Sequence, residues 1–154
     1  MSAPRSHVLH RAGSWSGAQA TIALDYEARF LRRKRLQTGC GLAFFVDLAE
    51  TVSVNDGDAF ELSDGLIVAV RAAPEPLHTV SGDNLARFAW HIGNRHTPCQ
   101  IEASRLLIRR NPVLADMLRR LGAELSDIDA PFTPEGGAYG HGRTMGHDHH
   151  AHDH

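Results

Sequence analysis

The stretch NPVLADMLRRLG, residues 111–122, is the clearest helix signal in the chain and sets the class of the fold around it. Asn111 is a candidate N-cap, Pro112 fits the first turn, and Gly122 fits the end of a helix. Apolar side chains at helical spacing share one face: Val113, Leu114, Met117, Leu118 and Leu121. We therefore predict an amphipathic helix over these residues.

A second helix is predicted upstream, in DNLARFAWHIGNR at 83–95. Asp83 is its candidate N-cap, and Gly93-Asn94 is a natural C-terminal stop. Its apolar positions also recur at helical spacing: Leu85, Phe88, Ala89 and Ile92.

Short apolar segments between and around the two helices predict four strands. They are LHTV (77–80), CQIEA (99–103), RLLIRR (105–110) and AELSDI (123–128). The resulting order, β-α-β-β-α-β, is the ferredoxin-like arrangement, in which two helices cover one face of a four-stranded antiparallel sheet. The fold class expected for the chain is therefore α+β.

The first half of the chain has a different pattern, of short strands separated by turns. ATIALDY alternates, with Ile22 and Leu24 on one side, and Asp56-Gly57 and Asp64-Gly65 are tight-turn signals. We predict a small antiparallel β domain at 1–72 and a proline-stiffened linker at 73–76. A ferredoxin-like domain would follow at 77–138, and a mobile, disordered His-rich tail at 139–154.

Composition excludes several classes of function. Of 154 residues, 42% are hydrophobic, so a core can form, while a net charge of −2 argues against general nucleic-acid binding. The two cysteines, Cys40 and Cys99, form no disulfide framework and no CxxC zinc pair. No apolar run resembles a signal peptide or a membrane span, so a cytoplasmic location is expected.

The C-terminal stretch GAYGHGRTMGHDHHAHDH, 137–154, predicts metal binding. Its histidines are His141, His147, His149, His150, His152 and His154. Neutral imidazole suits Ni(II), Cu(II) and Zn(II), and Asp148 and Asp153 could add oxygen ligands. An expression tag is the alternative, but engineered tags are usually unbroken histidine runs. A flexible arm loses chain entropy when it is ordered on a metal, which favours transport, buffering or storage over catalysis.

His96 is a second candidate ligand. The helix predicted at 83–95 ends before it, and Thr97 precedes a proline, so His96 should lie on a short connector with its ring free. A lone histidine there is more often a surface or capping residue, but a two-fold axis would bring two copies to one ion. His91 is expected on the helix surface, and Cys99 is equally well explained as a buried strand cysteine.

A basic cluster leaves two interpretations open. It comprises Arg29, Arg32, Arg33, Lys34 and Arg35. A solvated edge strand protected by charge against aggregation is favoured over a docking face for an acidic protein or nucleic acid. The remaining histidines, His7, His10 and His78, have no ligand-like neighbours in the sequence.

Several segments together resemble a known family. They are WHIGNRHTPCQIE (90–102), LLIRRNPVLADMLRRLGA (106–123), APFTPEGGAYGHG (130–142), DYEARFLRRKRLQ (25–37) and VSVNDGDAFELSDGLIVAVRAA (52–73). The chain is similar over almost its whole length to the UreE family of urease accessory proteins, which are nickel metallochaperones. The combination of GNRH, P-x-Q-I and PEGGAYGHG is specific to that family.

The resemblance implies an N-terminal peptide-binding-like β domain and a homodimer joined through the C-terminal domains. It implies that His96 of both subunits binds nickel at the interface and that His141 and the later histidines complete the nickel shell. The implied partners are the urease apoprotein and the other accessory proteins, especially the maturation GTPase. Some family members carry an extra histidine pair before the second helix, whereas Arg109, Arg110 and Asn111 stand here.

The hypothesis that follows is a non-enzymatic Ni(II) carrier serving urease assembly, with Zn(II) or Cu(II) bound in competition. General nickel or zinc storage is one alternative. A metal-dependent hydrolase using His91, His96 and Glu102 is another, disfavoured because the sequence has no HExxH and no compact ligand triplet.

Overall fold

The computed structural model describes residues 3–136, and the chain divides into two compact units, Met1–Ala73 and Pro74–His154. The predicted mixed α+β class is confirmed. The expected tail at 139–154 lies outside the described residues. No helix of the described part is long and apolar enough to cross a membrane.

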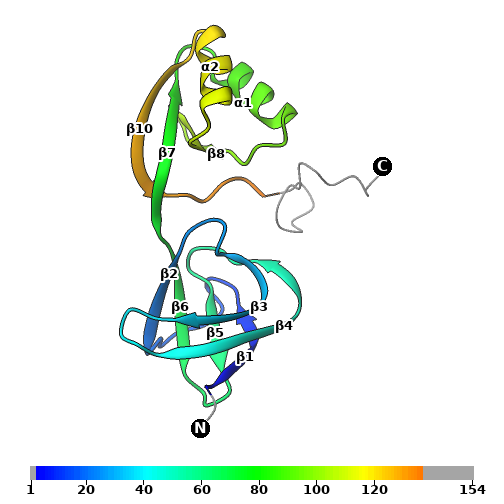
Figure 1. Ribbon diagram of the computed structural model, residues 1–154, viewed down its shortest axis with the longest axis vertical. Helices are drawn as coiled ribbons and strands as arrows, with labels where there is room; N and C mark the ends of the chain where they lie inside the picture. The colour runs from blue at the N-terminus through cyan, green and yellow to red at the C-terminus, as the bar shows by residue number, and fades with distance from the viewer. Residues whose placement is uncertain (1–2, 137–154) are drawn as a thin grey trace. The chain divides into compact units, whose positions relative to one another are not determined.

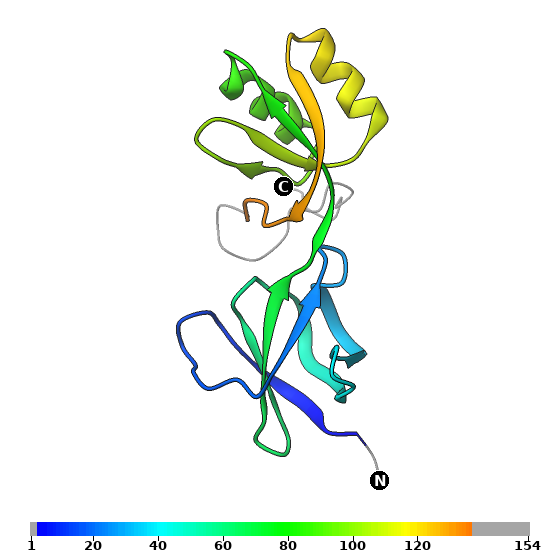
Figure 2. The same cartoon turned by 90° about the vertical axis from the view of Figure 1, so that its left-hand side faces the viewer.

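The first unit is one six-stranded sheet with strand order β2-β6-β5-β1-β4-β3 (Figures 1 and 2). Its strands are β1 (Arg5–His10), β2 (Ala20–Leu24), β3 (Phe30–Gln37), β4 (Ala43–Ser53), β5 (Ala59–Leu62) and β6 (Ile67–Ala72). The expectation of a purely antiparallel domain was wrong, because β1 runs parallel to β4 and β2 runs parallel to β6. Both parallel pairs join strands that are distant in sequence, so the chain can cross over between them instead of turning back in a hairpin.

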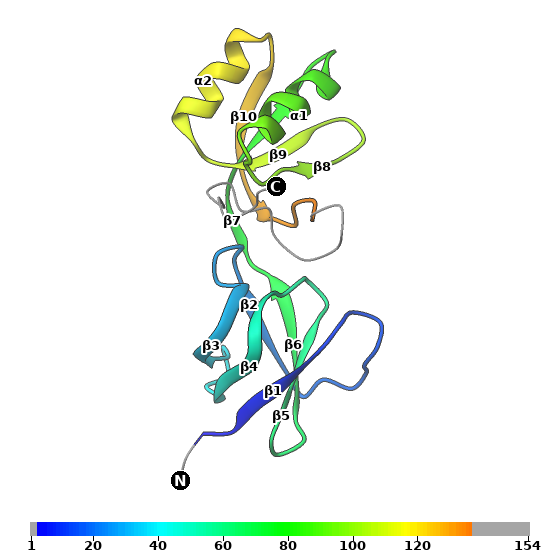
Figure 3. The same ribbon diagram turned by 90° about the vertical axis from the view of Figure 1, so that its right-hand side faces the viewer.

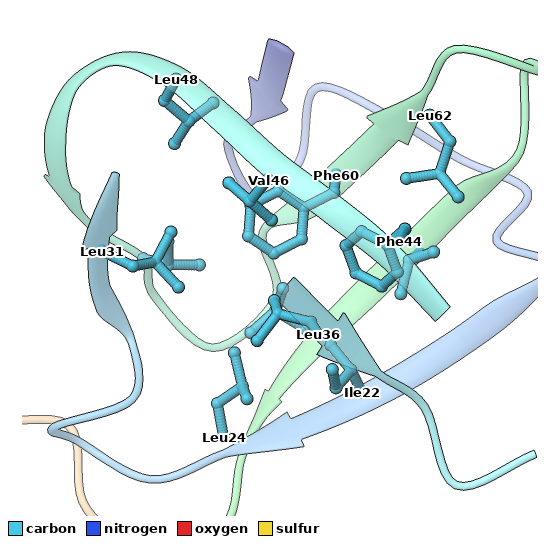
Figure 4. Close-up of a cluster of buried hydrophobic side chains, with 12 residues drawn as sticks. Ile22, Leu24, Leu31, Leu36, Phe44, Val46, Leu48, Phe60 and Leu62 are labelled. Atoms are coloured by element: carbon cyan, nitrogen blue, oxygen red, sulfur yellow. The ribbon is translucent and has the colours of Figure 1, made fainter. Parts of the chain in front are cut away.

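Side chains from β2 to β6 meet in the core of this unit (Figure 4). Ile22 and Leu24 both point into it, as the alternation of ATIALDY predicted. Phe44 and Phe60 pack with their ring centroids 5.8 Å apart. The Asp-Gly turns are also confirmed: Gly57 and Gly65 have positive φ, 93° and 90°, which glycine adopts without steric cost.

The second unit has the predicted element order β-α-β-β-α-β. Its elements are β7 (Pro74–Ser81), α1 (Leu85–Asn94), β8 (Gln100–Ile101), β9 (Leu106–Arg109), α2 (Pro112–Arg120) and β10 (Glu124–Pro131). The sheet has the order β10-β7-β9-β8, and every pair is antiparallel. Both helices lie on the same side of this sheet (Figures 1 and 3). They share one buried cluster with it, which includes Val80, Phe88, Ile108 and Leu118.

The two helices start differently. At α2 the Asn111 side chain accepts hydrogen bonds from the N–H groups of Val113 and Leu114, so the predicted cap is confirmed. At α1 the N-cap is Asn84 and makes no side-chain cap hydrogen bond, so the prediction of Asp83 was wrong. The predicted apolar face of α2 was wrong at Val113, which is 70% exposed.

The expected linker at 73–76 overlaps a strand. Pro74, Glu75 and Pro76 are the first residues of β7 and pair with β10, at Pro131, Ala130 and Asp129. On the other side of β7, pairing with β9 starts only at Leu77. The two prolines therefore stand where the strand has a partner on one side, the position at which a sheet tolerates a missing N–H.

Candidate metal centre

The connector that follows α1 holds its backbone in a tight, unusual turn. The N–H of Arg95 donates to the carbonyl of Ile92 at 3.1 Å, and the N–H of His96 donates to that of Gly93 at 2.9 Å. His96 has φ of 56° and is the one non-glycine residue with positive φ in the described part of the chain. For an L-residue this conformation costs roughly 1–2 kcal/mol. A costly backbone that is kept for a histidine marks this position as a functional candidate.

The His96 side chain is exposed, as the sequence predicted. Within residues 3–136 its ring has no hydrogen-bond or ion-pair partner. Neither ring nitrogen is therefore engaged by residues 3–136, and a neutral imidazole nitrogen is a ligand for Ni(II), Cu(II) or Zn(II).

His91 does not join His96 in a site of its own subunit. It lies half-buried on α1, with its ring edge-on to Trp90 at a centroid distance of 5.0 Å. No three His, Cys, Asp or Glu side chains are grouped to hold a metal anywhere in residues 3–136. The triplet required by the hydrolase alternative, His91, His96 and Glu102, is therefore not assembled. Glu102 instead accepts hydrogen bonds from Arg105 Nε and Gln100 Nε2, each at 2.7 Å.

Cys99 lies near the candidate site as a protonated thiol. Burial, with a smaller contribution from the nearby charge of Glu135, raises its pKa to about 11. Because the thiolate is the metal-binding form of cysteine, Cys99 is a poor ligand at neutral pH. Its side chain packs instead against the core of the second unit.

The last described residues lie beside this connector. Phe132 is fully buried, and the Thr133 N–H then donates to Gln100 Oε1 at 2.8 Å. The Glu135 N–H donates to the Cys99 carbonyl at 2.9 Å. After β10 the chain thus returns to β8, as the orange segment shows in Figures 2 and 3. Gln100 was not among the predicted site residues, although the P-x-Q-I motif contains it.

Of the predicted ligands, only His96 lies in the described residues. The other six lie outside them: His141, His147, His149, His150, His152 and His154. The chain that carries them leaves the described part at Gly136, one residue after the Glu135 hydrogen bond to the connector.

The remaining described histidines lie on two strands, His7 and His10 on β1 and His78 on β7, and each lies near a carboxylate. His10 Nε2 is 2.7 Å from Glu61, and His78 Nδ1 is 2.8 Å from Asp127. His7 Nδ1 lies 4.0 Å from the Asp47 carboxylate. These contacts are structural pairs in the two sheets.

The structure divides the basic cluster predicted at residues 29–35. Arg29 is only 3% exposed and donates to the carbonyls of Leu24 and Val54, so it is a core residue. Arg33 is exposed and pairs with Asp47 at 3.1 Å. The other cations lie on β3, which is an edge strand of its sheet, as the solvated-edge interpretation expects.

Two family profiles match the chain almost end to end. Residues 4–73 match the profile described as UreE urease accessory protein, N-terminal domain. Residues 70–154 match the one described as UreE urease accessory protein, C-terminal domain.

Similar whole proteins carry the same description. A urease accessory protein UreE from Ruegeria pomeroyi is 56% identical over 149 residues, which covers 97% of this chain and 100% of the relative. One from Cereibacter sphaeroides is 60% identical over 147 residues, covering 95% of this chain and 80% of the relative. One from Paracoccus denitrificans is 68% identical over 125 residues, covering 81% and 80%.

Proposed function

The chain belongs to the UreE family of urease accessory proteins, and from this we propose that it is a metallochaperone that carries Ni(II) to the urease apoprotein. Membership of that family implies a role in urease maturation. Nickel is the cargo, and Zn(II) or Cu(II) compete for the same imidazoles, because affinity order alone favours copper over nickel. The protein acts in the cytoplasm, as a carrier and not as an enzyme.

One observation supports this proposal above the others. His96 stands exposed on a turn of unfavourable backbone conformation, and the root of the His-rich tail is hydrogen-bonded next to it. His141 follows Gly136 by five residues. At about 3.5 Å per extended residue, its Cα can reach roughly 18 Å from Gly136. A tail tethered this close offers imidazole at an effective concentration on the order of mM.

A single His96 is too few ligands for a tight site, so the carrier is proposed to be a homodimer. An isologous two-fold contact would bring both copies of His96 to one ion. Two large apolar side chains of the same unit support such a contact, because Trp90 is 63% exposed and Ile101 is 53% exposed. Trp90 lies on α1, six residues before His96, and Ile101 lies on β8, five residues after it.

Release follows from the same arrangement. Tail imidazoles can be exchanged one at a time for the ligands of a partner, so the ion passes to the partner without losing all its ligands at once. The partners proposed are the urease apoprotein and the other urease accessory proteins, including the maturation GTPase.

The proposal is tested by nickel calorimetry on the full chain, on a chain ending at Gly140 and on His96→Ala. We expect the tightest site to hold one ion per dimer and to disappear in His96→Ala. The shortened chain should keep the dimer's ion but bind it more weakly, because the tail ligands are missing. His91→Ala is the matched control and should bind nickel like the unmodified protein.

Retention of the tightest site and its stoichiometry in His96→Ala contradicts the proposal. Storage without delivery makes a different prediction, namely many weak sites and unchanged urease activity in cells that lack the protein. Delivery predicts low urease activity in those cells and its rescue by excess nickel.

A further inference from the structure

A side-chain network on β8 and the turn between β8 and β9 holds the start of the C-terminal tail. It comprises Arg105, Glu102, Gln100 and the backbone of Thr133, with the Glu135 N–H bonded to Cys99 beside it. Gln100 is its central residue, because it bonds in both directions. Its Nε2 donates to Glu102 Oε2 at 2.7 Å, and its Oε1 accepts from the Thr133 N–H at 2.8 Å.

Gln100 makes these two bonds because the network fixes which way its amide points. An ionised carboxylate can only accept, so Glu102 requires the Nε2 end of the amide. Arg105 Nε donates to the other Glu102 oxygen, and this hydrogen bond lowers the Glu102 pKa. Glu102 therefore stays ionised at neutral pH and turns Gln100 Oε1 toward the tail.

The same contacts lie beside an edge strand. Among the described strands, β8 is the last of its sheet and is bonded to β9. The Thr133 N–H donates to the Gln100 side chain on β8, and the Glu135 N–H donates to the carbonyl of Cys99, just before β8. The residues that follow β10 are thus bonded to Cys99 and Gln100, which come three and four positions after His96 in the chain. Thr133 itself is 33 positions after Gln100.

We propose that Gln100 is a positioning residue for nickel capture, because its side chain holds Thr133 next to the Glu135 bond to the Cys99 carbonyl, and the two contacts form a clasp that sets where the tail starts relative to His96. This inference rests on the proposed nickel function. With the clasp closed, the last fixed residue, Glu135, lies six positions before His141; with it open, Phe132 lies nine before. Effective concentration falls as about the −3/2 power of chain length, so opening lowers it about twofold.

The same coupling must act in reverse. If a closed clasp favours tail ligation, then nickel held by the tail stabilises the clasp by the same factor, because linked binding equilibria are reciprocal. Nickel should therefore slow amide exchange at Thr133 and Glu135 in the full chain, but not in the chain ending at Gly140.

The decisive variant is Gln100→Glu. It keeps an acceptor for the Thr133 N–H but places a second carboxylate against Glu102, so the network opens by like-charge repulsion. We expect the Thr133 and Glu135 amides to exchange about fivefold faster or more, as for the loss of one hydrogen bond. Nickel Kd should rise about twofold in the full chain and stay unchanged in the chain ending at Gly140.

A second substitution provides the rescue. Adding Glu102→Gln to Gln100→Glu swaps the amide and the carboxylate between the two positions. The amide at position 102 then donates to the carboxylate at position 100, and its oxygen still accepts from Arg105 Nε. This pair should restore slow exchange and nickel affinity, which general damage to the fold would not allow. Gln37→Glu, on the exposed end of β3, is the matched control and should change neither quantity.

Two outcomes overturn the clasp. Unchanged exchange at Thr133 and Glu135 in Gln100→Glu means that the side chain does not hold the tail root. Faster exchange with unchanged nickel Kd in the full chain means that the root does not position the ligands. Equal nickel binding by the full chain and His96→Ala would instead refute the proposed function, and the exchange rates would still decide whether the clasp forms.

Discussion

At the scale of single residues, the two cysteines show how much one local contact changes chemistry. Thr38 Oγ1 lies 3.1 Å from Cys40 Sγ, and this hydrogen bond, with a second from the Leu42 backbone, lowers the pKa of Cys40. Cys40 is exposed, whereas Cys99 is partly buried and burial raises its pKa to about 11. The two thiols should therefore differ sharply in reactivity, since the thiolate is the nucleophile.

We predict that iodoacetamide at pH 7.5 alkylates Cys40 at least about tenfold faster than Cys99 in the folded protein. Peptide mass spectrometry over a time course measures both rates. In urea the two rates should converge, because the unfolded chain removes both environments. Earlier modification of Cys99 in the folded protein would contradict the burial described for it.

Residue-level features were predictable where the signal was local. The exposed position of His96 on its connector was predicted, and so was the Asn111 cap, from its place before Pro112. Gln100 was not identified, because its role depends on a hydrogen bond to Thr133, which is 33 positions away in the chain. The positive φ of His96 was also not predicted, because the position is not occupied by glycine or asparagine, the residues that usually indicate a left-handed backbone.

At the scale of secondary structure elements, the two helices allow a matched comparison of N-caps. Asn111 caps α2 with two side-chain hydrogen bonds, while Asn84 precedes α1 with none. We predict that Asn111→Ala lowers the free energy of unfolding by about 1 kcal/mol. Asn84→Ala should change it by less than about 0.5 kcal/mol.

Urea unfolding of the full chain, followed by circular dichroism, measures both changes. Because both substitutions remove the same side chain from an exposed N-cap, helix propensity contributes equally and only the cap bonds differ. Equal losses in the two variants would show that the Asn111 hydrogen bonds contribute nothing net.

Elements were predictable from the sequence where hydrophobic periodicity was strong. Both helices and the strands of the second unit were found, because Phe88, Ile92, Leu114 and Leu118 mark buried faces. β1 was missed because the one residue it buries fully is polar, Ser6, while Val8 is exposed. Parallel pairing in the first unit depends on contacts between distant strands, and no local pattern reports it.

At the scale of the whole molecule, each unit has a core of its own. Among the described residues, the buried members of the first cluster lie between Ile22 and Val70, and those of the second lie between Val80 and Ala123. A unit with a separate core can in principle fold alone. We predict that residues 74–154 expressed by themselves fold and bind nickel within about threefold of the full-chain affinity, because the connector, clasp and tail all belong to that unit.

Circular dichroism and nickel calorimetry on that fragment check the prediction, with the same fragment carrying His96→Ala as its control. A folded fragment with a much weaker tight site would mean that the first unit contributes to metal capture. An unfolded fragment would mean that the second core is not sufficient for stability.

The turn at His96 places two demands on one position that no single amino acid meets equally well. Its left-handed backbone suits glycine or asparagine, while its exposed imidazole is what a metal requires. Over generations, relaxed need for metal would let this position drift toward the residues that the turn prefers. The persistence of histidine there in a lineage would therefore be a record of continued use.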